Sequence, residues 1–279
     1  RSSMVEPKTN ADIQRLWTTG LRLLCFYAAA LWTVQGLAEG QKPEPKKPEP
    51  PAIAVVLPLG VEAGSRQKLT LRGLNVTNAT AVRLTGLTPT LTAEIKERGA
   101  APKIDGFESK RVGDQRLEVE LSLPANTPAG TNLALVVVSP DGDSKPFPLL
   151  VAAAGRLIGE QEPNNGFREA GALDFGKTVR GALQTLTDID VFRCELQAGQ
   201  TLRAKVVAER LGATLDATLS LYDAQGRLLT SNDDAQGSGR DPLLEFKAPS
   251  AGRYLLAVSS VTEKAGAASV YLLTVTTAP

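Results

Sequence analysis

The chain has 279 residues, which is enough for about two domains that each bury a hydrophobic core. Hydrophobic residues make up 42% and aromatic residues 5%, a composition that excludes a disordered or fibrous chain. The 31 lysines and arginines nearly balance the 30 aspartates and glutamates, so the molecule as a whole has no electrostatic attraction to nucleic acid or anionic lipid.

The sequence contains no histidine, which removes the usual general base and the usual zinc ligand. Ser-His and Cys-His nucleophile pairs are excluded for the same reason. The chain also lacks a Gly-x-Ser-x-Gly elbow, a phosphate loop and a nucleotide fingerprint. We therefore expect no enzymatic activity and no nucleic-acid partner.

Residues 1–38 have the pattern of a signal peptide. Arg15 and Arg22 precede an apolar run over residues 23–34, and residues 36–38 supply small side chains for a cleavage site. The run is shorter than the ~20 apolar residues of a membrane-spanning helix, so we expect no stable membrane span in the mature protein. The pattern predicts a secreted, periplasmic or cell-surface protein.

Residues 39–51 are rich in proline and are expected to form an extended spacer. From residue 52 to residue 153, short β-prone runs alternate with turn residues, and no run has helical periodicity. Six runs are expected to be strands: 53–57, 68–72, 80–84, 116–121, 132–138 and 147–151. Residues 140–143 are predicted to form a hairpin turn, because Gly142 accepts a positive φ. Six or seven antiparallel strands predict an immunoglobulin-like sandwich.

The opening of this region resembles the IPT/TIG-type immunoglobulin-like domains. The similarity is carried by residues 58–64, 69–75 and 81–84. In that family such domains act mainly as spacers or binding modules, and the resemblance implies the same role here.

Residues 154–279 are expected to form a second β-sandwich of the jelly-roll type, which makes the whole chain all-β. Leu219 and Leu221 alternate with Ser220 and Tyr222, as in a sheet with one buried face and one wetter face. Eight runs are expected to be strands: 179–183, 189–196, 201–208, 217–222, 228–231, 243–246, 253–259 and 270–276.

The two cysteines are not expected to form a disulfide in the mature protein. Cys25 lies in the segment that we expect to be removed, which leaves Cys194 alone. Cys194 shares a strand face with Phe192 and Leu196, so we expect it to be a small buried side chain.

Two acidic stretches of the second sandwich have the chemistry of a calcium site. Glu160, Glu162 and Asn164 alternate, so an extended backbone places their side chains on one side. Asp188 and Asp190 repeat that spacing on a loop that enters a strand. If the first stretch folds across this loop, the carboxylates repel one another and a divalent cation offsets the repulsion. The alternative is a solvated linker and an ordinary turn.

The same region resembles the bacterial pre-peptidase C-terminal (PPC) domain, which is a non-catalytic domain. Its matching segments, in order, are residues 160–165, 170, 179–181, 188–192, 198–202, 219–223, 226, 232–234, 251–254 and 271–275. In calcium-binding members the ligands come from the opening acidic segment and from the aspartates before the Phe-containing strand. The resemblance assigns this role to Glu160, Glu162, Asn164, Asn165, Asp188 and Asp190. Some relatives have aspartate at the position of Asn165, so the predicted site has one charge fewer.

A second acidic loop, residues 232–234 with Asp241, is interpreted as a hairpin turn, with a metal site as the alternative. For the whole chain we predict an exported, non-catalytic protein that engages an extracellular polymer or protein partner or assists secretion. In this prediction, Ca²⁺ orders the N-terminal segment of the PPC-like domain. One alternative is a metal-free structural protein of the cell envelope. The other is a carboxylate-based glycosidase, because paired Asp and Glu residues alone can hydrolyse glycosides.

Overall fold

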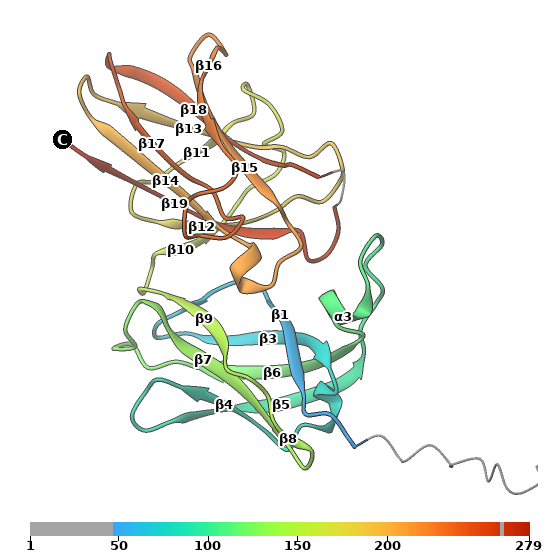
Figure 1. Cartoon of the computed structure of the whole chain (residues 1–279). Coiled ribbons are helices and arrows are strands. Elements are labelled where there is room, and N and C mark those ends of the chain that lie inside the picture. The colour runs from blue at the N-terminus through green and yellow to red at the C-terminus, as the bar shows by residue number, and fades with distance from the viewer. Residues whose placement is uncertain (1–46, 263–264) are drawn as a thin grey trace, which may run out of the picture. The chain divides into compact units, whose positions relative to one another are not determined.

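The computed structural model describes residues 47–262 and 265–279. The predicted signal peptide and most of the proline-rich spacer lie outside these residues. Within the described part of the chain, no helix is both long and apolar enough to cross a membrane. The described residues are mainly β-strands arranged in two sandwiches, as Figure 1 shows.

The first sandwich places apolar side chains on alternate positions of its strands. In β3, for example, Leu69 and Leu71 are fully buried, whereas Lys68 and Thr70 between and beside them are not. One sheet has the order β1 (Ala52–Leu57), β3 (Arg66–Leu74), β6 (Gln115–Ser122) and β5 (Leu91–Ala100). The other continues from β5 through β4 (Ala81–Thr85), β7 (Gly130–Ser139) and β9 (Phe147–Ala152) to β2 (Val61–Glu62).

Eight of the nine strands of this region form one continuous path, because β5 pairs with both β6 and β4. All neighbouring strands are antiparallel except β2, which runs parallel to β9. The predicted hairpin at residues 140–143 is present, because β8 (Gly142–Asp143) pairs with β7. Short helical segments occur at η1 (Val76–Asn78) and at α3 (Ser109–Val112).

The second sandwich consists of two five-stranded sheets. The first has the order β10 (Leu157–Gly159), β12 (Thr178–Ala182), β19 (Val270–Ala278), β14 (Thr201–Val207) and β17 (Leu243–Lys247). The second has the order β11 (Gly171–Ala172), β13 (Asp190–Leu196), β18 (Gly252–Ser260), β15 (Ala217–Asp223) and β16 (Leu228–Asn232). A short 3-10 turn, η2 (Glu209–Leu211), follows β14.

The eight predicted strands of this sandwich are confirmed, and the predicted faces are correct. Phe192, Cys194 and Leu196 are buried together in β13. Leu219 and Leu221 are fully buried, whereas Ser220 and Tyr222 are half-buried.

β10 and β11 were not predicted, and they position the candidate site. Each is a very short edge strand that runs parallel to its neighbour, β10 along β12 and β11 along β13. The chain therefore leaves the edge of one sheet after Gly159 and joins the edge of the other at Gly171. The residues between them, 160–170, are called the arm below.

Candidate metal centre

The arm is tied to both sheets by backbone hydrogen bonds. Glu160 N donates to Arg180 O at 3.0 Å, and Val191 N donates to Asn164 O at 2.9 Å. These two bonds hold the alternating acidic stretch of the arm beside the beginning of β13. The alternating acidic stretch therefore lies beside the loop that carries Asp188 and Asp190.

Three carboxylates converge at this point. Each of Glu160, Glu162 and Asp190 offers one oxygen, and these oxygens all lie within 4.8 Å of one another. Asp190 is fully buried, Glu160 is half-buried and Glu162 is exposed, so the cluster opens to solvent on one side. Like charges at this separation disfavour full ionisation unless a cation or a proton offsets them.

Asn164 lies in the same cluster and is fully buried. One terminal atom of its amide is 3.0 Å from Asp190 Oδ1 and 2.9 Å from Glu162 Oε2. If that atom is nitrogen, it donates to both carboxylates and the cluster is satisfied without an ion. If it is oxygen, three oxygens face one another, which is favourable only around a cation. A rotation of this one amide therefore distinguishes the two states.

Tyr271 is a site residue that the sequence analysis missed. Its hydroxyl is fully buried, donates to Asp190 Oδ2 at 2.6 Å and lies 3.1 Å from Glu160 Oε2. Gly181 makes this possible, because a Cβ there would lie 2.2 Å from Tyr271 Cζ and 2.5 Å from Glu160 Oε2. The available signal was a tyrosine on the inward face of a strand, whose hydroxyl must find a buried partner.

Burial is the main influence on the acidity of the site. It raises the pKa of Asp190 to about 8, and the nearby charges of Glu160 and Asp188 act in the same direction against the Tyr271 hydrogen bond. Burial also raises the pKa of Glu160, whereas hydrogen bonds from Ala182 N and Tyr271 act to lower it. In the absence of a cation, the cluster therefore retains a proton near neutral pH.

Asp188 flanks the cluster without joining it. Its Oδ2 accepts a hydrogen bond from Gln184 N at 2.6 Å, and its Oδ1 is buried without a hydrogen-bond partner among the described residues. Asn165 is exposed and lies outside the cluster. Of the six predicted ligands, the structure thus brings together Glu160, Glu162, Asn164 and Asp190.

The donor set fits Ca²⁺. It contains carboxylate and amide oxygens, is exposed to solvent at Glu162, and includes no histidine or cysteine ligand of the kind that favours zinc. Asp188 Oδ1 lies beside this set and is buried without a hydrogen-bond partner among the described residues. A nearby cation would compensate the cost of burying this oxygen.

The second acidic loop has a structural role instead. Asp241 Oδ1 accepts hydrogen bonds from Ala208 N and Glu209 N, and its Oδ2 pairs with Arg210 Nε at 3.0 Å. Asn232 Oδ1 accepts a hydrogen bond from Leu243 N. These contacts fix η2 and the turn before β17, which agrees with the interpretation of this loop as a turn.

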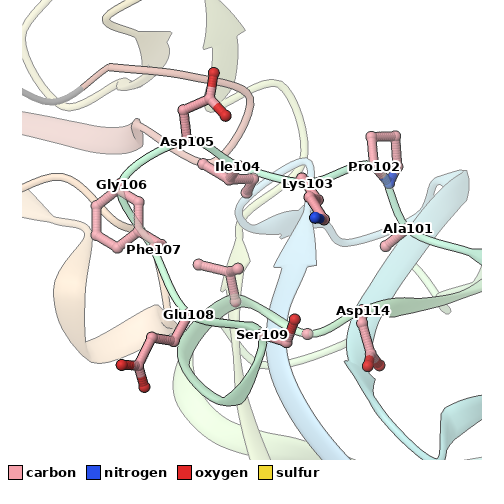
Figure 2. Close-up of a pocket in the computed structure, with 12 residues that line it drawn as sticks. Ala101, Pro102, Lys103, Ile104, Asp105, Gly106, Phe107, Glu108, Ser109 and Asp114 are labelled. Carbon is pink, nitrogen blue, oxygen red and sulfur yellow. The ribbon is translucent and has the colours of Figure 1, made fainter.

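A separate hollow of about 510 Å³ lies within the loop that joins β5 to β6, as Figure 2 shows. Ile104 and Val112 form part of its apolar wall and pack near Ala268. The carboxylates of Asp105 and Glu108 point away from its centre in Figure 2. Because polar groups do not converge there, the hollow lacks the features of a specific binding site.

The family model described as "Bacterial pre-peptidase C-terminal domain" matches residues 188–260. The second sandwich carries a pre-peptidase C-terminal domain. The PPC resemblance inferred from the sequence is thereby confirmed. The arm, residues 160–170, precedes the matched residues.

A relative described as a "probable subtilase-type serine protease" of Deinococcus radiodurans is 39% identical over 102 residues. The match covers 36% of this chain and 14% of that protein, so this chain spans only a small part of the protease's length. The solved PPC domain of a Bacillus anthracis collagenase is 19% identical and covers 42% of this chain and 99% of its own, with a TM-score of 0.32. PliG of Aeromonas hydrophila, a periplasmic inhibitor of g-type lysozyme, is 16% identical and covers 44% of this chain and 98% of its own, with a TM-score of 0.29.

Proposed function

We propose that this chain is an exported, non-catalytic accessory protein whose PPC domain binds Ca²⁺ through Glu160, Glu162, Asn164 and Asp190. Asp188 lies beside these ligands and adds negative charge. The observation that carries the proposal is the convergence of three carboxylates with ligand oxygens within 4.8 Å of one another, next to a fully buried amide. Bound Ca²⁺ offsets the repulsion among these groups.

The ligands connect the arm to the body of the sandwich. Glu160, Glu162 and Asn164 belong to the arm, whereas Asp190 is the first residue of β13. Further along the arm, Ala170 packs with Val191, Leu255 and Ala257 on the outer face of the second sheet. Cation binding at one end of the arm therefore stabilises the packing of the other end against this apolar face.

For the biological role, we propose that the domain engages an extracellular polymer or protein partner or assists secretion. The Deinococcus relative is described as a protease, but this chain spans only 14% of it, so a protease activity is not transferred. The absence of histidine from the sequence supports a non-catalytic role.

The metal-free structural protein is the second candidate function. The Asn164 amide favours it, since with nitrogen toward Asp190 and Glu162 the cluster is satisfied without an ion. The glycosidase alternative is disfavoured, because Asp190 is fully buried and so is not accessible to a sugar substrate.

Calorimetric titration of the full chain with CaCl₂, together with thermal unfolding in CaCl₂ and in EDTA, tests the proposal. We expect a binding isotherm and a stabilisation of about 2.7 kcal/mol at a hundredfold excess of Ca²⁺ over the Kd. Glu162→Gln, at an exposed position, should weaken binding without unfolding the protein. Asp234→Asn, an exposed carboxylate of the other acidic loop, is the matched control and should bind like the parent. Absence of both heat and a Tm shift would overturn the proposal in favour of the metal-free function.

A further inference from the structure

The arm contains the pair Asn165-Gly166, the one place in the sequence where glycine follows asparagine. The other seven asparagines are each followed by a residue that has a Cβ. A side-chain amide carbon is attacked most readily by the next backbone nitrogen when no Cβ hinders the approach, which is the condition that glycine provides.

The surroundings of Asn165 leave this reaction unobstructed. Its side chain is exposed, and no hydrogen bond is found for it within the described ranges 47–262 and 265–279. The same holds for the Gly166 N–H in that part of the chain, while Gly166 O accepts a hydrogen bond from Glu169 N at 3.2 Å. The amide can therefore rotate towards the backbone nitrogen of the next residue.

Asn164, the preceding residue, is in the opposite situation. Its side chain is fully buried, and its amide lies against Asp190 and Glu162. Its carbonyl is tied to β13 by the hydrogen bond from Val191 N. Two adjacent asparagines thus differ in exposure, in constraint and in the residue that follows, so Asn164 is an internal control for its neighbour.

We propose that Asn165 is a site of spontaneous deamidation, which places a new carboxylate in the arm beside the carboxylate cluster. The Gly166 nitrogen loses its proton and bonds to Asn165 Cγ, and the Cγ–N bond to the side-chain nitrogen breaks, so that ammonia leaves and a succinimide remains. Water then opens the ring at either carbonyl. The products are aspartate and isoaspartate, and the net reaction consumes one water and releases one ammonia.

The consequence for the arm rests on the proposed function. Asn165 is the predicted ligand position at which this chain has an amide rather than a carboxylate, and the residue before it belongs to the cluster. An aspartate there increases the negative charge near Glu162 and Asp190, which raises the affinity for a divalent cation. The aspartate product therefore gives a stronger cation site than the parent chain has.

Peptide mapping of the full chain after prolonged incubation at mildly alkaline pH tests the modification. We expect the peptide with residue 165 to gain the mass of an NH₂-to-OH exchange and to separate into an aspartate and an isoaspartate form, while Asn164 stays intact. Gly166→Ala should slow the conversion several-fold. The added Cβ would meet only the end of the exposed Glu169 side chain, which can move away.

A synthetic peptide of residues 163–170 provides the reference rate for an unconstrained chain. If Asn165 in the folded protein stays intact while the peptide converts, or if Asn164 converts equally fast, the proposed deamidation is wrong. The consequence is measured separately by calcium titration of Asn165→Asp against the parent. If Asn165 deamidates but Asn165→Asp binds Ca²⁺ with the same affinity as the parent, only the strengthening of the site is refuted. If Asn165 deamidates in a protein that binds no Ca²⁺, only the proposed function is refuted.

Discussion

At the scale of single residues, the cluster depends on one hydroxyl that satisfies two acids. Tyr271 reaches Asp190 and Glu160 from β19, on the sheet opposite β13, so its hydrogen bonds cross the interior of the sandwich. Removing a buried donor leaves its acceptors with the full cost of desolvation, about 1–3 kcal/mol. The hydroxyl of Tyr271 therefore stabilises the fold as well as the site.

We predict that Tyr271→Phe destabilises the protein in EDTA by about 1–3 kcal/mol, measured by urea unfolding. Tyr254→Phe is the matched control, because Tyr254 is also buried and donates a single hydrogen bond to Ser250 O at 2.8 Å. Its loss should cost about 1 kcal/mol or less. Equal effects of the two substitutions, or no effect of Tyr271→Phe, would show that the hydroxyl has no special role in the acidic cluster.

The sequence identified the acidic and amide residues of the cluster better than it identified which of them touch. The alternation of Glu160, Glu162 and Asn164 correctly placed three side chains on one side, because an extended backbone has a period of two. It did not exclude Asn165 and Asp188 from the cluster, since residue spacing does not reveal the bend after Asn164 or the hydrogen bond from Gln184 N that occupies Asp188 Oδ2. Tyr271 was missed because it is more than 80 residues distant from either acidic stretch in sequence terms.

At the scale of elements, the exposed side of the first sheet carries a ladder of ion pairs. It joins four basic and four acidic side chains of β3, β5 and β6: Arg66, Lys68, Lys96, Arg116, Glu94, Glu97, Glu118 and Glu120. Such pairs contribute little individually, but six of these eight side chains each contact two partners of opposite charge. Glu120 pairs with both Arg66 and Lys96, and hydrogen bonds from these two residues hold the pKa of Glu120 below its usual range.

We predict that Glu120→Gln lowers the Tm at low ionic strength and that the difference shrinks in about 1 M NaCl, where screening is strong. Glu245→Gln is the control, because Glu245 is an exposed strand residue whose one ion-pair partner in the described part of the chain is Arg203. It should change the Tm less at either salt concentration. Thermal unfolding at two salt concentrations measures both, and a salt-independent loss for Glu120→Gln would contradict an electrostatic role.

This ladder also explains why β5 was the one long strand that the sequence did not predict. Only Ala93 of its ten residues is buried, so it lacks the alternation of apolar side chains that identifies a strand. Its position is set instead by the charged neighbours on β6 and by its crossing from one sheet to the other. The strands with a buried face, such as β3 and β13, were predicted because their hydrophobic pattern is local.

At the scale of the whole molecule, the two sandwiches share part of their core, which the sequence could not reveal. Residues 48–279 form one compact unit. Val55 and Leu59 of the first sandwich belong to the hydrophobic cluster of the second. Arg180 donates to Leu59 O at 2.8 Å and to Gly60 O at 3.0 Å. The contacts join residues about 120 positions apart, whereas sequence periodicity describes only neighbours.

At Gly212 the backbones of the two sandwiches approach each other closely. It follows η2 in the second sandwich with a φ of +80°, and a Cβ there would lie 1.9 Å from Ala54 O of β1. The glycine is required both for the left-handed conformation and for the close approach of another backbone. Arg111 supports the same junction by donating to Gly212 O at 3.0 Å and to Ala213 O at 2.8 Å.

We predict that Gly212→Ala separates the unfolding of the two sandwiches, whereas the parent unfolds in one cooperative transition, because the added methyl group forces β1 and η2 apart. Gly199→Ala is the matched control: its φ of +84° imposes similar backbone strain, but no atom lies within 4 Å of the new Cβ. Calorimetric unfolding, with hydrogen exchange to assign each transition, should show a modest Tm decrease and one transition for Gly199→Ala. Two transitions in the parent, or one in Gly212→Ala with the Tm of the control, would mean that the shared core does not couple the sandwiches.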